Sequence, residues 1–243
     1  MTPQQLSQKA IARLQSLSNP SSAEGVKRFY KPHEQIHAYG VNLPQLRMLS
    51  TDLFKEIKAE WKLSEAIEFC EIQLAEDFME NKHLGIFLLA RFKKRFVPSL
   101  LKSANRWLNS DLCANWAATD ALCMYVIGPL IEMHSQLAPD LLKWSHLENL
   151  WVRRASAASL VSLARKGQHL DLAYQIAEEL FSDKEDLIHK ATGWLLREAG
   201  KTDAARLEQF LLQHGPRIPR TALRYAIERF PEGKRKSILE RTR

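Results

Sequence analysis

The chain has 243 residues, which is long enough for one or two ordinary domains with a substantial buried core. Its 35 Lys and Arg against 28 Asp and Glu give a net charge of +7, a balance that suits a polyanionic partner. The longest apolar runs, 84–90 and 121–131, are too short to cross a bilayer, and three cysteines without a C-x-x-C pair argue against a disulfide framework. We therefore expect a soluble protein in a reduced, cytoplasmic compartment.

The segments show helical periodicity with capping signals between them, and no convincing strand is found. The first helix has Thr2 as its expected N-cap and Pro3 at its first position. An irregular stretch is expected at about 31–43. The predicted helices, in chain order, cover residues 3–18, 21–30, 44–60, 64–76, 77–95, 98–108, 111–127, 130–137, 138–145, 149–166, 168–181, 184–200, 202–213, 217–229 and 231–241.

An internal repeat appears when four of these segments are aligned. Each opens with Asp or Asn in an N-cap position, and the openings at Asp77, Asp111, Asn149 and Asp186 are 34, 38 and 37 residues apart. A helix pair that recurs at this interval indicates an α-solenoid with a period slightly shorter than that of HEAT repeats. We predict an all-α protein whose single domain covers 1–243, a right-handed superhelix with a basic concave groove.

One arc of the predicted inner helices collects conspicuous side chains. Counted from each opening residue, Trp116 and Arg154 lie at offset five, Trp194 at eight and Asp120 at nine. At about 100° per residue these positions share an arc of roughly 100°. They therefore project from the same side of three neighbouring helices. Further cations are expected along the same edge, namely Lys82, Arg153, Lys190 and Arg197.

Taken singly, each of these residues has an ordinary structural interpretation. Trp116 and Trp194 suit helix packing, and Asp120 suits a pair with an arginine on the next helix. Arg153 and Arg154 suit a solvated or salt-bridged pair. The functional interpretation depends on their convergence in adjacent repeats.

Three motifs resemble those of the AlkD-type alkylpurine DNA glycosylases, which are built from HEAT-like repeats. They are Asn115-Trp-Ala-Ala-Thr-Asp120, Trp151-Val-Arg-Arg-Ala155 and Lys190-Ala-Thr-Gly-Trp-Leu-Leu-Arg197. Tyr39-Gly-Val41, followed by Pro44-Gln-Leu-Arg47, is similar to a loop of that family. The resemblance extends over most of the chain.

This resemblance implies that Asp120 is the catalytic acid, that Trp116 and Trp194 hold the deoxyribose, and that Arg154 grips the phosphate backbone. It implies double-stranded DNA containing N3- or N7-alkylated purines as substrate, recognised without extrusion of the base. No metal or organic cofactor is implied. Ala117 departs from the family pattern, which often has a second acid there, and an N-terminal aromatic is expected at Phe29 or Tyr30.

The segment His33-Glu-Gln-Ile-His37 matches the H-E-x-x-H zinc-protease pattern by its letters alone. Such a site needs both histidines on one helical turn and a third ligand. Pro32 and Gly40 leave little room for that helix, and Leu43 stands where a third histidine would be. We therefore predict no metal site.

The sequence predicts a monofunctional DNA glycosylase, expected to be monomeric. It lacks an evident Lys nucleophile beside Asp120, so a lyase step is not expected. One alternative is a non-catalytic protein that binds damaged or branched DNA through the same groove. The other is a HEAT-type scaffold for protein interactions.

Overall fold

A computed structural model describes residues 1–30 and 35–243 of the chain. Over these residues the secondary structure is helical, apart from one isolated β-bridge between His37 and Phe78. The predicted all-α, α-solenoid-type repeat fold is confirmed. None of the helices in the described ranges is long and apolar enough to cross a membrane.

The chain divides into two compact units, so the expected single domain over 1–243 stays a prediction. Unit 1 comprises residues 1–100 and 110–113, and unit 2 comprises 101–109 and 114–243. Leu14, Leu53 and Phe69 are fully buried in unit 1. The helices of unit 1 are α1 (Pro3–Ser16), α2 (Pro20–Lys27), α3 (Leu43–Ile57), α4 (Leu63–Ala75) and α5 (Met79–Ala90).

A buried carboxylate holds the Tyr39-Gly40-Val41 loop in unit 1. The carboxylate of Glu80 accepts backbone N–H bonds from Tyr39 at 3.0 Å, from Gly40 at 2.8 Å and from Val41 at 3.1 Å. Gly40 has φ +81°, and a Cβ there would lie 2.2 Å from the carbonyl oxygen of Asn19. The Tyr39-Gly40-Val41 motif therefore has a structural role, which is to form this loop around the Glu80 carboxylate.

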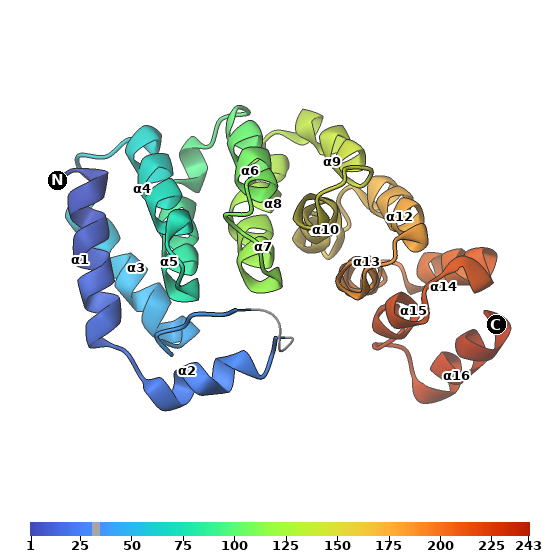
Figure 1. Cartoon of the computed structure of the whole chain (residues 1–243). Coiled ribbons are helices and arrows are strands. Elements are labelled where there is room, and N and C mark those ends of the chain that lie inside the picture. Colours follow the sequence, from blue (N-terminus) through green and yellow to red (C-terminus); the bar gives the residue numbers. More distant parts are fainter. Residues whose placement is uncertain (31–34) are drawn as a thin grey trace. The chain divides into compact units, whose positions relative to one another are not determined.

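Unit 2 consists of two rows of helices (Figure 1). Helices α7, α10, α13 and α15 follow one another in contact, and α9 and α12 pack behind them. The helices are α6 (Leu100–Asn109, whose first residue belongs to unit 1), α7 (Trp116–Leu122), α8 (Gly128–Met133), α9 (Ala138–Trp144), α10 (Leu150–Ala158), α11 (Val161–Ala164), α12 (Leu170–Glu179), α13 (Asp186–Ala199), α14 (Ala204–His214), α15 (Arg220–Ala226) and α16 (Glu232–Arg241).

The starts of the repeats differ from the sequence prediction. Asn149 caps α10 as expected, but the caps of α5 and α13 are Phe78 and Glu185. Asp111 has a left-handed φ of 56°, and α7 begins only at Trp116. Its cap is Asn115, whose side-chain oxygen accepts the N–H of Ala118 at 2.8 Å. Asn115 therefore caps α7 in place of Asp111, because its side chain satisfies a backbone N–H of the first helical turn.

A wide π turn, residues Cys123–Ile127, joins α7 to α8. The N–H of Gly128 bonds to the carbonyl of Cys123, and Pro129 follows in the first turn of α8. Proline lacks an N–H and crowds the carbonyl four residues before it, so a wider turn lets the chain remain helical. The predicted break between 127 and 130 is therefore a π turn within a continuous helical stretch.

Helices α13 and α15 approach each other closely at Gly193. A Cβ at this position would lie 2.5 Å from both the carbonyl oxygen of Ala222 and the Cβ of Tyr225. Because backbone atoms cannot give way cheaply, only glycine allows the two helices to approach this far.

We predict that Gly193→Ala destabilises the protein by about 1–3 kcal/mol, the usual cost of overpacking. The matched control is Gly25→Ala in α2, where a Cβ meets nothing within 4 Å. Because alanine also favours the helix, Gly25→Ala should be neutral or stabilising by up to ~1 kcal/mol. Urea denaturation of both variants checks this, and equal midpoints would contradict the packing argument.

Candidate functional site

Asp120 and Arg154 form a bidentate ion pair in unit 2. The Nε and Nη2 atoms of Arg154 donate to the two carboxylate oxygens of Asp120, each at 2.8 Å. The Nη1 atom of the same guanidinium donates to the carbonyl oxygen of Leu187. One arginine of α10 thus connects a carboxylate on α7 with the first turn of α13.

The observed N-caps explain why these two residues face each other. Asp120 is the fifth residue after Asn115, and Arg154 is the fifth after Asn149. Equivalent positions in adjacent repeats face the same way, so side chains of opposite charge there can meet. Lys190, the fifth residue after Glu185, continues this column on α13. The residues at the fifth position after each N-cap are called the fifth-position column below.

The pair is shielded from solvent. The side chain of Asp120 is 16% exposed and that of Arg154 is 6% exposed. Burial raises the pKa of Asp120 above its ordinary value, while the charge of Arg154 and its hydrogen bonds act in the opposite direction. A carboxylate has about four lone-pair sites, so two donors from Arg154 leave acceptor capacity for another group.

Both predicted tryptophans lie on helices that Arg154 contacts, Trp116 on α7 and Trp194 on α13. Trp116 is the first residue of α7, four residues before Asp120 and on the same face of the helix. Trp194 lies on α13 seven residues after Leu187, and therefore about two turns along the same face. Both side chains are partly exposed.

The other predicted cations all have intramolecular partners. The Nε atom of Arg153 lies 2.6 Å from an oxygen of Asp183, and Lys190 pairs with Asp186 at 2.8 Å. Arg197 contacts the carboxylates of Glu198 and Glu228. Lys82 belongs to unit 1, where its ammonium donates to the carbonyls of Leu74 and Leu112, and burial lowers its pKa.

Sequence patterns miss two features of this arrangement. The carbonyl of Leu187 is a main-chain acceptor that no residue identity can reveal. The fifth-position column appears only when helices are counted from their true caps, and the prediction counted α7 from Asp111. Asn115 is itself a preferred N-cap residue. Counting from Asn115 and from Asn149 would have placed Asp120 and Arg154 at the same position.

Of the two residues expected to supply the N-terminal aromatic, Phe29 follows the end of α2 and is 73% exposed. The letters of the H-E-x-x-H pattern fall partly outside the described residues, because His33 and Glu34 lie in 31–34. Among the residues that are described, no three His, Cys, Asp or Glu side chains gather as a group that could hold a metal ion.

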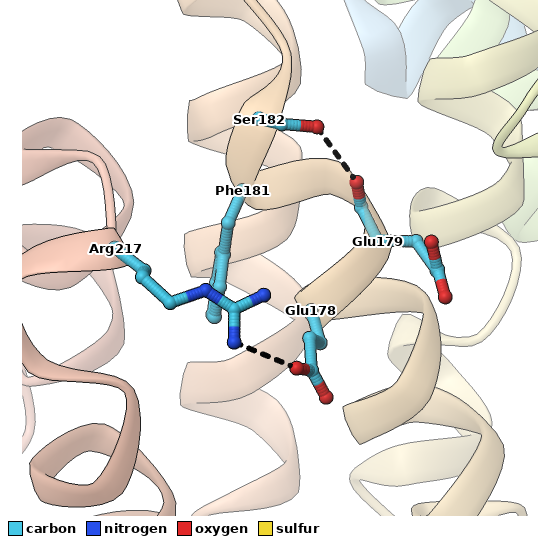
Figure 2. A pocket seen from close by; sticks show the side chains of 5 residues that line it. All are labelled: Glu178, Glu179, Phe181, Ser182 and Arg217. Carbon is cyan, nitrogen blue, oxygen red and sulfur yellow. Dashed lines mark hydrogen bonds and ion pairs between the residues drawn. The ribbon is translucent and has the colours of Figure 1, made fainter.

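A cavity of about 310 Å³ lies elsewhere in unit 2 (Figure 2). Arg217 points toward Glu178 there, with 3.0 Å between the Nη1 and carboxylate oxygen atoms. The remaining lining residues are Glu179, Phe181 and Ser182. None of the predicted site residues lines this cavity.

The comparisons with known proteins show the family and the fold of the chain. The model of the family described as DNA alkylation repair enzyme matches residues 10–230, and the chain therefore belongs to that family. A solved structure described as a predicted DNA alkylation repair enzyme from Enterococcus faecalis is similar, with a TM-score of 0.77 and 22% sequence identity. The similarity covers 88% of this chain and 97% of that one, and shows the fold. No curated protein matches the sequence.

We predict that Arg154→Met destabilises the protein by about 3–5 kcal/mol near neutral pH, because it leaves the Asp120 carboxylate buried without its partner. Losing Arg154 raises the pKa of Asp120 further, so the native state then binds a proton more tightly than the unfolded chain does. Stability of the variant should therefore recover as the pH falls, and the difference from wild type should shrink. Urea denaturation between about pH 4 and 7.5 checks this; a pH-independent difference would contradict it.

Proposed function

We propose that this DNA alkylation repair family member is a monofunctional DNA glycosylase that hydrolyses the N-glycosidic bond of N3- or N7-alkylated purines in duplex DNA. The observation that carries the proposal is the Asp120 carboxylate on α7, the helix of Trp116, held by two bonds from Arg154. The same arginine bonds to the Leu187 carbonyl of α13, the helix of Trp194. A role in DNA repair follows from the family itself.

The reaction asks little of the enzyme apart from electrostatic stabilisation. A purine alkylated at N3 or N7 carries a positive charge and is already a good leaving group. As its bond to the sugar breaks, positive charge develops on the deoxyribose. A carboxylate in a poorly hydrated site attracts that charge strongly, and a free lone pair of Asp120 can hold the attacking water. Water adds its hydroxyl to the anomeric carbon and gives its other proton to the Asp120 carboxylate, which passes it to solvent. The electron pair of the broken bond leaves with the base, which thereby becomes neutral.

Arg154 takes a different role here from the one that the family resemblance implies. Its guanidinium has donors directed at Asp120 and Leu187, and its side chain is 6% exposed. We therefore propose that it orients the carboxylate and keeps it ionised, as a positioning residue. Contact with DNA phosphates is then proposed for Lys190, because its side chain is 41% exposed although it pairs with Asp186 on its own helix. The side chains of Arg153 and Arg197 are each 18% exposed, and Lys82 is held by two carbonyls.

The two tryptophans complete the proposed site. An indole face attracts a cation, and a partly exposed indole also offers an apolar surface to a sugar. Trp116 and Trp194 would thus bind the deoxyribose of the cationic nucleotide from two helices. The backbone would supply the remaining contacts, without extrusion of the base into a closed pocket.

A second candidate function is binding of damaged or branched DNA without catalysis. It is favoured by the same ion pair, because Arg154 occupies both oxygens of Asp120 and offsets its charge. It is also favoured by Ala117, which stands where the family often has a second acid. The two candidates differ in whether a free base is released.

The deciding variant is Asp120→Asn, which keeps the shape of the side chain and removes its charge. We expect release of methylated purine from alkylated duplex DNA to be abolished, while affinity for DNA stays within a few-fold of wild type. The released base is measured by chromatography and the affinity by fluorescence anisotropy on the same duplex.

Asp140→Asn is the matched control, since Asp140 is a half-exposed aspartate of unit 2 that pairs with Lys143 on the same helix. This variant should release base at the wild-type rate. Undiminished release by Asp120→Asn would remove Asp120 from the mechanism. Absence of release by the wild-type protein, with DNA binding intact, would favour the non-catalytic function.

The pH dependence of excision supplies an independent prediction. Only the ionised carboxylate stabilises a cationic sugar, and burial raises the pKa of Asp120. The rate constant should therefore fall with decreasing pH at a higher pH than the ~3.9 of an ordinary aspartate. Single-turnover excision, corrected for loss of base without enzyme, measures this. A rate constant that stays flat down to about pH 4 would contradict an ionised Asp120 with a raised pKa.

A further inference from the structure

The fifth-position column extends one helix beyond the residues of the proposed site. Helix α15 follows its N-cap Pro219, and the fifth residue after that cap is Arg224. The column therefore runs from Asp120 through Arg154 and Lys190 to Arg224, on four successive inner helices. No motif in the sequence indicated this last member.

Members of the column differ in how far their charge is already neutralised. Asp120 and Arg154 neutralise each other, and Lys190 is paired with Asp186 on its own helix. Arg224 is exposed, and within the described parts of the chain it has no ion-pair partner. It is thus the member of the column most available to an external anion.

Contacts between α13 and α15 place the helix that carries Arg224 next to the helix that carries Trp194. Asp186 is hydrogen-bonded to Thr221 across this interface. Further along, the Cβ of Tyr225 lies at the Gly193 crossing, and Arg197 pairs with Glu228. Tyr225 is 38% exposed, so an aromatic surface lies beside Gly193, the residue that precedes Trp194.

We propose that Arg224 and Tyr225 of α15 form a second DNA-contact element, in which Arg224 binds a backbone phosphate and Tyr225 packs against an adjoining deoxyribose. This rests on the proposed function, because it takes DNA as the polyanion. A cation without a protein partner releases a condensed counterion when it binds phosphate, whereas a tyrosine does not. The two residues therefore leave different signatures in the salt dependence of binding.

The test measures the dissociation constant for a short duplex at several NaCl concentrations, using the full chain. For Arg224→Gln we expect weaker binding and a slope of log affinity against log salt that is smaller by about 0.9, the value for one phosphate contact on B-DNA. Arg224→Lys should restore the slope. Tyr225→Ala should weaken binding a few-fold with the wild-type slope. Arg217→Gln is the control, because the guanidinium of Arg217 pairs with Glu178 at the Figure 2 cavity.

The outcomes separate this inference from the proposed chemistry. A wild-type slope for Arg224→Gln, in a variant that is folded by circular dichroism, would overturn the inference even if the protein releases methylated purine. An equal fall in slope for Arg217→Gln would overturn it too, because the effect would then reflect net charge alone. Conversely, the wild-type protein could release no base while the salt slope falls for Arg224→Gln and not for Arg217→Gln. That result would contradict the proposed glycosylase activity and support the phosphate contact of Arg224.

Discussion

The ion pair between Asp120 and Arg154 is the interaction on which the candidate site depends. Moving two charges out of water is expensive, and only the bidentate geometry with further hydrogen bonds offsets that cost. The pair links α7 to α10, and the bond from Arg154 to the Leu187 carbonyl extends the link to α13. Three helices are thereby held in one register, which fixes where the residues that they carry can lie.

Repetition is what makes such a pair possible in a helical protein. A residue on one helix faces the equivalent residue of the next when the helices are counted from their caps. Opposite charges at one position then neutralise each other, as Asp120 and Arg154 do. Of the two cations that follow at the same position, Lys190 pairs with Asp186 and Arg224 is exposed. Gly193 allows the next helix to join this arrangement, because the absence of a Cβ lets α15 pack closely against α13. Scaffold and site therefore follow from the same register.

Much of the fold could be predicted from the sequence, because capping residues and helical periodicity are local signals. The cap Asn149 and the helix after it are such a case. The start of α7 could not be predicted in the same way. Asp111 and Asn115 are both plausible caps, but Asp111 has a left-handed conformation and Asn115 caps α7. The π turn before Gly128 likewise depends on how the chain accommodates Pro129.

For the site, the residue types and their convergence on neighbouring helices could be predicted, but their pairing could not. Sequence offsets brought Trp116 and Arg154 into one column, whereas counting from the true caps aligns Asp120 with Arg154. That one-turn difference changes the proposed role of Arg154 from a phosphate contact to the support of a carboxylate. Counting α15 from its cap, Pro219, places Arg224 in the column as well, a residue that no motif had indicated.

The most direct test of this account is the product formed by the wild-type protein on duplex DNA methylated at purines. The account predicts free 3-methyladenine or 7-methylguanine in solution and an abasic, uncut strand that breaks only on later treatment with alkali. Salt-sensitive binding to the same duplex, with every methylated base still attached to its strand, would contradict it.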